Sequence, residues 1–204
     1  MFIKLLHTLS AHRFIPVLLI FLGFITSINS FASEDDIRRR VAFKLFRATL
    51  AADMKLTTKI SSDNTLHLIL VYKENKVSSK LQIKDFIKRY PLDNLYKSIK
   101  RIPVSIAFIS TSELLHPRFN RWEKLAGIYL LDELPEKFLQ NISRSAIASQ
   151  IISYSPFKGD VEAGILGGLY VGNKVQPYIN IKVMKQSNIH LKPFFMKVIK
   201  RYEP

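Results

Sequence analysis

Cysteine is absent from this chain of 204 residues, and the absence excludes several kinds of chemistry at once. The chain can form no disulfide, no thiolate metal site, no lipid-anchored N-terminal cysteine and no cysteine nucleophile. The compartment stays open on this evidence, because many exported proteins fold without disulfide bridges.

Glycine is scarce, and five of the seven glycines fall within residues 159–172. The sequence has no Gly-x-Ser-x-Gly elbow, and "GILGG" has neither the spacing of a dinucleotide loop nor the Lys-Ser/Thr of a phosphate loop. We therefore interpret Gly164, Gly167 and Gly168 as architecture, either a bulge or a close approach of two strands.

Acidic residues are also few, since 16 Asp and Glu stand against 31 Lys and Arg, a net charge of +15. Such an excess indicates nucleic acid, an anionic membrane face or an acidic protein surface as partner. The bases are scattered, with dense clusters only at residues 38–40 and 100–101, and no aromatic-basic RNA-binding motif is present. We expect no nucleic-acid partner, and a merely solvated basic surface stays an alternative.

The N-terminus has the pattern of a secretory signal. Lys4 and Arg13 precede an apolar run of 12 residues (14–25), and Ser30 and Ala32 fit a small-residue cleavage site. We predict a signal peptide over residues 1–32, cleaved near Ala32, and a single domain over residues 33–204 in the periplasm. An uncleaved anchor is the alternative, although a membrane span needs about 20 apolar residues.

Apolar residues make up 48% of the chain, enough for a core. Helical and strand-like patterns alternate along it. Helices are predicted over residues 33–54, 77–90, after 111 and from 134 to 146; strands are predicted over 65–72, 102–110, 126–132 and 147–155. This order predicts a three-layer α/β fold around a mostly parallel sheet.

The pattern changes after Gly159. Two apolar segments flank "GNK" (172–174), which indicates a β-hairpin, and residues 191–203 have the apolar spacing of a terminal helix facing inward through Phe194, Phe195, Val198 and Ile199. The loop after the fourth predicted strand would lie at the carboxyl end of the parallel sheet, where ligands bind in such folds.

The order "GDVEAGI…KVQPYINIKVMKQSNIHLKPFFMKVIKRYE" resembles the C-terminal half of the YfiR-type periplasmic proteins, and "HLILVY" and "IAFIS" fit the first half in outline. The motif-like part runs from Gly159 to Asn180. The resemblance implies an exported, compact α/β protein that represses a membrane signalling protein, such as a diguanylate cyclase, through its periplasmic portion. This chain lacks the cysteines that some relatives use for disulfides, so redox control has no basis here.

Within the motif, Asp160 and Glu162 form an acidic pair that could bind a partner or ligand. The alternative, which we favour, is that Asp160 caps the backbone turn after Gly159. Asn180 lies in an apolar strand and must bond its amide if buried. We predict that its side chain holds the backbone of the 159–164 loop, with Gly159, Gly164 and Pro177 as further structural residues.

Elsewhere, Trp122 and Tyr129 with the bases Arg118 and Arg121 are candidate contacts, because Trp, Tyr and Arg are enriched at interface hot spots. Trp122 fits a core position equally well. The mature chain's histidines, His67, His116 and His190, fall one to an element, so we expect no metal site, and no cofactor motif is present.

Two classes of function follow. The first is a non-enzymatic periplasmic regulator whose partner is a membrane protein with a periplasmic domain; a homodimer with a second copy of the chain is a further candidate. The second is a small-molecule binder or an enzyme with its site at the 159–164 loop. A pocket converging on Asp160, Glu162 and His190 would favour the second class.

Overall fold

The computed structural model describes residues 34–74, 97–116, 119, 122 and 125–204. Residues Asp35–Pro204 form one compact unit. The predicted signal peptide and the helix predicted over residues 77–90 lie outside the described residues. None of the helices within the described ranges is long and apolar enough to span a bilayer.

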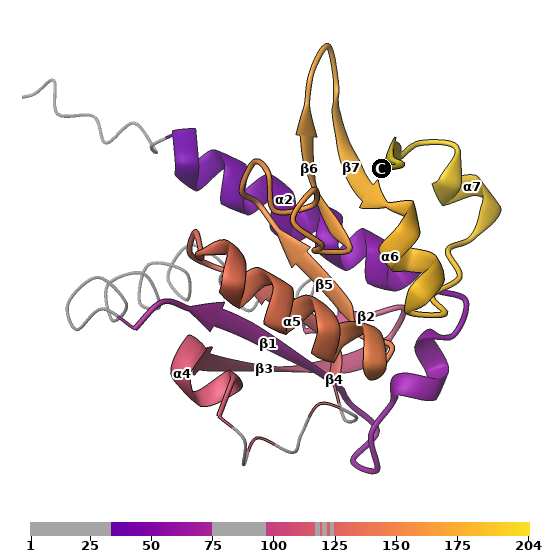
Figure 1. Cartoon of the computed structure of the whole chain (residues 1–204). Coiled ribbons are helices and arrows are strands. Elements are labelled where there is room, and N and C mark those ends of the chain that lie inside the picture. The colour runs from indigo at the N-terminus through magenta and orange to yellow at the C-terminus, as the bar shows by residue number, and fades with distance from the viewer. Residues whose placement is uncertain (1–33, 75–96, 117–118, 120–121, 123–124) are drawn as a thin grey trace, which may run out of the picture. The chain divides into compact units, whose positions relative to one another are not determined.

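The core of the fold is one sheet of eight strands, in the order β2-β3-β1-β4-β5-β6-β7-β8 (Figure 1). Neighbouring strands run parallel except in the pairs β2–β3 and β6–β7. This is the mostly parallel sheet with a C-terminal antiparallel hairpin that the sequence predicts. The strands are β1 Leu66–Tyr72, β2 Ser98–Ile99, β3 Ile102–Ser110, β4 Leu125–Leu130, β5 Ile152–Ser155, β6 Gly167–Val171, β7 Val175–Asn180 and β8 Lys200–Tyr202.

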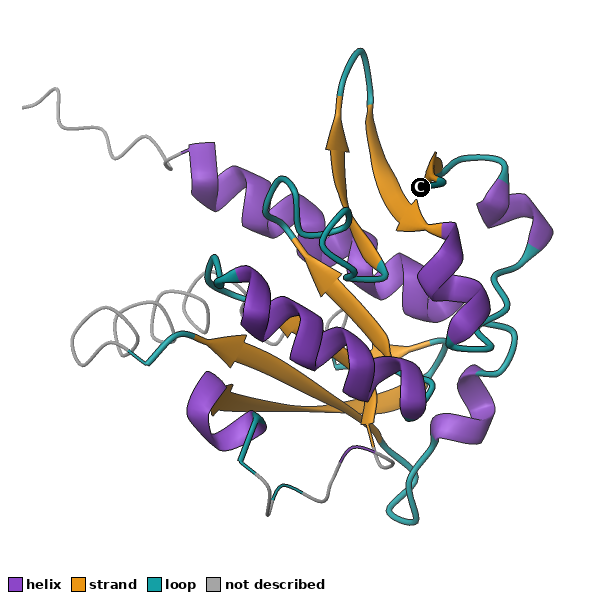
Figure 2. Ribbon diagram, viewed as in Figure 1, coloured by secondary structure: helices purple, strands orange, loops and turns teal. Residues whose placement is uncertain are grey.

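Helices cover both faces of the sheet (Figure 2). They are α2 Glu34–Ala52, the 3-10 helix η1 Leu56–Lys59, α4 Thr111–Leu114, α5 Glu136–Ala148, α6 Ile181–Gln186 and α7 Pro193–Met196. Alternate residues of β1 point to opposite faces. Leu68 joins the core on the α2 side, while Ile69 joins the core that includes Leu139 of α5. The three-layer α/β prediction is therefore confirmed.

Aromatic packing fixes α2 against the sheet. The ring of Phe46 lies 5.6 Å from that of Tyr129 and 5.7 Å from that of Tyr154, measured between centroids. The Tyr129 hydroxyl donates to the carbonyl of Arg39 at 2.8 Å. Tyr129 is fully buried, so its candidacy as a partner contact is wrong: the ring fills the core instead.

Most predicted boundaries are shifted by one or two residues, and two elements near the C-terminus differ more. The strand predicted over residues 147–155 begins only at Ile152, because α5 runs on to Ala148 and ends where Gln150 adopts a left-handed φ of 56°. The predicted terminal helix is confined to α7, and the chain then extends as β8, which pairs in parallel with β7. Phe195 and Ile199 are buried as predicted, whereas Phe194 and Val198 are exposed.

The hairpin of β6 and β7 extends past the end of β5. Ser155, the last residue of β5, pairs with Gly168, the second residue of β6. The remainder of β6 and the facing part of β7 lie beyond this point, as Figure 1 shows. The hairpin therefore stands beside the loops that follow the parallel strands.

Candidate functional site

The carboxyl ends of the parallel strands form the natural place for a site. β1 lies between β3 and β4, so the chain leaves it first toward one side of the sheet and later returns on the other. In open α/β sheets such a switch point leaves a crevice at the carboxyl ends, where ligands bind.

Hydrogen bonds connect the segments that follow β1, β3 and β4 at the carboxyl end of the sheet. The Lys73 amide, just after β1, donates to Oδ2 of Asp132, just after β4, at 2.8 Å. The Ser112 hydroxyl, after β3, donates to the carboxylate of Glu74. These polar side chains come from segments far apart in sequence, and the strand order brings them together.

The loop after β5 surrounds a buried carboxyl group. Asp160 is only 4% exposed and its Oδ2 accepts from the Ser155 hydroxyl at 2.5 Å. That hydroxyl in turn accepts from the Phe157 amide at 3.1 Å. The sequence favours Asp160 as the group that caps the backbone of the turn. In the structure the Ser155 hydroxyl bonds the backbone of the turn, and the Asp160 carboxylate bonds the Ser155 hydroxyl.

The environment of Asp160 favours its protonated form. Burial raises the pKa of Asp160 to about 6, the Ser155 hydrogen bond opposes the rise, and the nearby Glu133 and Glu162 add to it. Glu133 belongs to the loop after β4, so the interaction also places two loops side by side. Gly159 and Gly164 have φ of 91° and 113°, and this left-handed backbone suits glycine.

Asn180 holds the loop as the sequence predicts. It is 3% exposed, and its side-chain amide donates to the Val161 carbonyl at 2.8 Å. Its Oδ1 also accepts from the Val183 amide at 3.0 Å and so caps α6. One buried side chain thus joins the loop, the end of β7 and the start of α6. Pro177, also buried, pairs with Leu169 across the hairpin.

A row of tyrosines continues from this loop along the hairpin. The Tyr178 hydroxyl donates to Oε1 of Glu162 at 3.0 Å, and burial followed by the Glu162 contact raises the pKa of Tyr178 to about 12. Its ring lies 5.8 Å from that of Tyr170 and 6.0 Å from that of Tyr202. The amine of Lys200 stands 5.4 Å over the Tyr170 ring.

The described parts of these loops hold five carboxylates, together with the bases Lys73 and Lys158. We use "carboxyl rim" for the carboxylates that follow the parallel strands: Glu74, Asp132, Glu133, Asp160 and Glu162. Clustered carboxylates favour a cationic group on the ligand or partner. The pattern of charge along the sequence could not show this, because the acids come from three separate loops.

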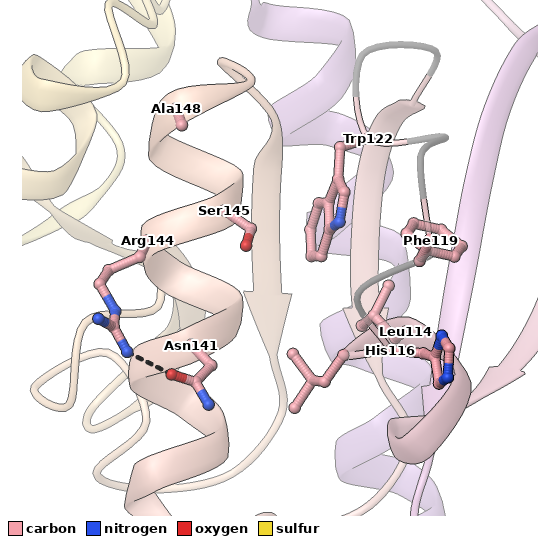
Figure 3. A pocket seen from close by; sticks show the side chains of 9 residues that line it. Leu114, His116, Phe119, Trp122, Asn141, Arg144, Ser145 and Ala148 are labelled. Atoms are coloured by element: carbon pink, nitrogen blue, oxygen red, sulfur yellow. Dashed lines mark hydrogen bonds between the residues drawn. The ribbon is translucent and has the colours of Figure 1, made fainter.

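The candidate contact Trp122 lies by a different hollow (Figure 3). A cavity of about 510 Å³ is lined by the end of α4, by Phe119 and Trp122, and by the C-terminal turns of α5. Trp122 is half-buried and packs against the core on the α5 side. Its ring meets that of Phe119 edge to face, with 5.6 Å between the ring centroids. Arg118 and Arg121 lie outside the described residues.

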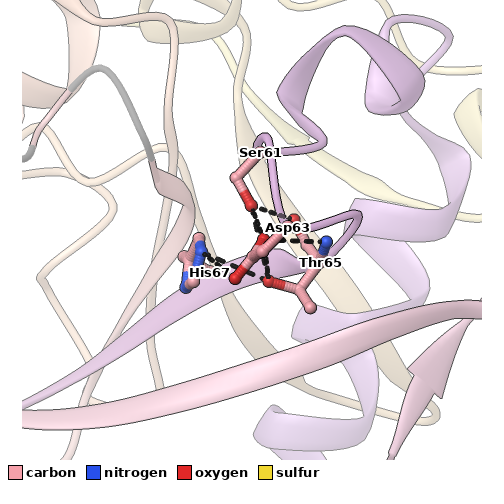
Figure 4. Close-up of polar contacts among 4 residues, drawn as sticks. All are labelled: Ser61, Asp63, Thr65 and His67. Atoms are coloured by element: carbon pink, nitrogen blue, oxygen red, sulfur yellow. Dashed lines mark hydrogen bonds and ion pairs between the residues drawn. The ribbon is translucent and has the colours of Figure 1, made fainter.

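The remaining polar cluster is a turn. Asp63 accepts from the hydroxyls of Ser61 and Thr65, and His67 lies 3.3 Å from its carboxylate (Figure 4). The hydroxyl bonds lower the pKa of Asp63 to about 2, with a smaller contribution from His67.

His190, near the C-terminal end of the chain, bonds the side chain of Asn188. In the described part of the chain, no group of three or more His, Asp or Glu side chains is placed to hold a metal ion.

Comparison with known proteins places the fold. No protein-family profile and no curated protein matches the sequence. The ABC domain in complex with L-Trp from Streptococcus pneumonia has a TM-score of 0.50 at 14% identity, covering 77% of this chain and 61% of that chain. This chain therefore spans less than two thirds of that chain's length, and the likeness shows the α/β fold alone.

Two further solved structures are similar to this chain at lower scores. A conserved domain protein from Vibrio cholerae has a TM-score of 0.49 at 14% identity, covering 73% of this chain and 58% of that chain. The ligand-free, open structure of a substrate binding protein with adhesive properties from Clostridium difficile has a TM-score of 0.48 at 15% identity, covering 73% and 57%.

Proposed function

We propose that this chain is an exported, non-enzymatic binding protein of the YfiR type, which represses a membrane signalling protein such as a diguanylate cyclase through its periplasmic portion. The observation that carries the proposal is the bond from Asn180 to the Val161 carbonyl. It joins the two halves of the motif on which the resemblance depends, and it fixes the loop and the hairpin as one unit beside the carboxyl rim.

The carboxyl rim sets the chemistry of the contact. Two of its exposed members, Glu133 and Glu162, lie near the buried Asp160, and the tyrosine row continues from Glu162. Tyrosine is enriched in protein interfaces, and complementary charge speeds the encounter of two proteins. The partner surface that fits is therefore positively charged, although the composition of the chain as a whole suggests an acidic partner.

Repression by such a protein is a shift of population. The target interconverts between active and inactive states, and a regulator that binds the inactive state more tightly moves the equilibrium toward it. The regulator needs a complementary surface and no catalytic group.

The test is a crosslinked pull-down from an envelope fraction with residues 33–204 as bait. We expect a membrane sensor with an exported domain to be recovered, and the double variant Glu133→Lys/Glu162→Lys to recover at least tenfold less. Glu203→Lys is the matched control, because it reverses one exposed acid outside the rim. Recovery of a second copy of this chain alone would overturn the proposal.

A second candidate is small-molecule binding, either at the 159–164 loop or in the cavity beside Trp122. The volume of this cavity, about 510 Å³, lies within the range of ligand pockets. A protein of similar fold was solved in complex with L-Trp. Calorimetry with a panel of amino acids tests this candidate. Loss of heat in Ala148→Trp would place the ligand in the cavity, and loss in Glu162→Lys would place it at the rim.

A further inference from the structure

The C-terminal part of the fold carries a strong local excess of positive charge. From Ile165 to the end of the chain there are seven bases and one acid: Lys174, Lys182, Lys185, Lys192, Lys197, Lys200 and Arg201 against Glu203. In the part of the chain that the structure describes, the ion pairs are Lys59 with Asp53 and His67 with Asp63, so no described carboxylate forms an ion pair with any of these seven bases.

Two large apolar side chains are exposed within this basic region. Phe194 is 64% exposed and Val198 is 51% exposed, four residues apart on the segment that leads into β8. Lys192, Lys197 and Lys200 flank them in sequence. We call this set of five residues the C-terminal basic surface.

The fold presents these side chains; they are not a loose chain end. Phe195 and Ile199, the neighbours of the exposed pair, are buried in the core. The backbone between them is bonded, with the Val198 amide donating to the Phe195 carbonyl at 3.0 Å. The side chain of Gln176 on β7 also donates to the Val198 carbonyl at 2.8 Å.

A second observation is that two lysines lie close together at the edge of this region. Lys100, in the turn between β2 and β3, lies beside Lys192, and this neighbour lowers the pKa of Lys100, while the Asp53 carboxylate acts in the opposite direction. Two ammonium groups repel each other unless an anion lies between them. An anionic surface that spans both lysines would relieve this repulsion.

We propose that the C-terminal basic surface docks on a bilayer rich in anionic phospholipid. Phe194 and Val198 enter the interfacial layer, and the flanking lysines lie against the lipid phosphates. Apolar side chains surrounded by Lys are typical of proteins that lie on membranes, since the apolar groups enter the interface and each base is attracted to the anionic lipid. The proposal goes beyond the proposed function and does not depend on it.

The composition of the surface favours a bilayer over an acidic protein. Lysine is depleted in protein interfaces, where Arg and Tyr are preferred. Six of the seven bases after Gly164 are lysines, and an exposed Phe beside lysines is an apolar anchor of the size that interfacial binding uses.

The experiment is co-sedimentation of residues 33–204 with vesicles. This piece contains the whole compact unit Asp35–Pro204 and lacks the apolar run 14–25, which would bind lipid by itself. Vesicles of phosphatidylcholine alone are compared with vesicles containing about a third phosphatidylglycerol. We expect at least tenfold tighter binding to the anionic vesicles, weakening steeply with salt.

Variants separate insertion from charge. Phe194→Ser should weaken binding about tenfold with an unchanged melting temperature, because the side chain is already exposed, and Lys197→Gln should weaken it about threefold to fivefold. Phe138→Ser, at an exposed phenylalanine of α5, is the matched control and should have no effect. The fluorescence of Phe194→Trp, in a Trp122→Phe background, should shift to the blue on anionic vesicles.

Several results would overturn the proposal. Equal binding to both kinds of vesicle, or full binding by Phe194→Ser, would exclude docking through this surface. Competition by millimolar inorganic phosphate with no change at Phe194→Ser would indicate a free-anion site. If Phe194→Ser binds no less lipid but recovers less protein in the envelope pull-down, the surface contacts an acidic protein instead. The vesicles hold no protein, so the outcome is independent of the regulatory proposal.

Discussion

At the scale of single residues, buried polar groups decide the local structure of the motif. Asn180, Asp160 and Ser155 are all buried, and each has a hydrogen-bond partner inside the protein. A buried polar group left without a partner costs about 1–3 kcal/mol, so these contacts specify one arrangement of loop and hairpin. The sequence alone predicts the Asn180 contact, because an amide in an apolar strand needs a bond.

We predict that Asn180→Leu lowers the free energy of unfolding by about 3 kcal/mol. Leucine leaves the Val161 carbonyl without its donor and removes the cap of α6. For a domain of this size the melting temperature should fall by about 6–12 °C in a thermal scan. Asn173→Ala, in the exposed hairpin turn, is the control. Unchanged melting with lost partner binding would make Asn180 a contact residue instead.

The second residue-scale prediction concerns Asp160 and pH. Folding raises its pKa from 3.8 to about 6, so between these values the folded chain binds more protons than the unfolded chain. This contribution to stability is therefore complete below pH 4 and is lost as pH rises through 6. In Asp160→Asn the loss should vanish, leaving the variant more stable by about 3 kcal/mol at pH 7 and by less than about 1 kcal/mol at pH 4. Urea unfolding at both values measures it, and a difference that does not change with pH would contradict it.

At the scale of elements, the fit of α2 to the sheet depends on one small residue. A Cβ at Gly127 of β4 would lie 2.7 Å from Cζ of Phe46, closer than Cβ atoms approach such a neighbour, and 3.1 Å from Cδ2 of Leu50, a tight contact. The absent side chain is therefore what allows the Phe46 ring to lie against the strand beside Tyr129.

We predict that Gly127→Ala lowers the free energy of unfolding by about 1–3 kcal/mol, the usual cost of overpacking a core. Phe46→Leu alone should also destabilise, but the two changes together should cost less than their sum, because leucine vacates the space that the new methyl group needs. Urea unfolding of the four proteins of this double-mutant cycle measures the coupling. Strict additivity would show that the two positions do not share space.

The sequence predicts most elements but not all. Apolar runs and helical spacing locate α2, β1, β3, β4 and the hairpin, because each of these patterns buries its apolar side chains in only one kind of element. The pattern of residues 194–199 is compatible with two structures: a helix with one apolar face, or one helical turn followed by a strand. Pairing of β8 with β7 selects the second, and that tertiary contact leaves no local signal.

The site is predictable only in outline for a related reason. The rule that ligands lie at the carboxyl ends of parallel strands identifies the loop after β5 in advance. The carboxyl rim also depends on two contacts between loops, Asp132 with Lys73 and Glu133 near Asp160. The order of strands in the sheet brings these loops together, and that order cannot be predicted from the sequence alone.

At the scale of the whole molecule, the described acids and bases are unevenly distributed within one compact unit. The carboxyl rim gathers acids from three loops, while the segment after Gly164 carries seven bases and one acid. A protein so divided can present its rim to a cationic partner while its basic surface lies on an anionic one. Both contacts weaken as salt screens them, over a Debye length of about 8 Å at physiological ionic strength.

The continuity of the core predicts how the unit unfolds. The core on the α2 side runs from Phe43 through Tyr154 to Ile199, so the hairpin, through Ile179, and the residue before β8 share it with the parallel strands. We therefore predict one cooperative transition in urea. Trp122 fluorescence, which reports the α5 side, and far-UV circular dichroism should give the same midpoint, as should the fluorescence of Tyr202→Trp in a Trp122→Phe background. Earlier loss of the signal from this β8 probe would mean that the hairpin and β8 unfold as a unit of lower stability, despite the core that Ile179 and Ile199 share with α2.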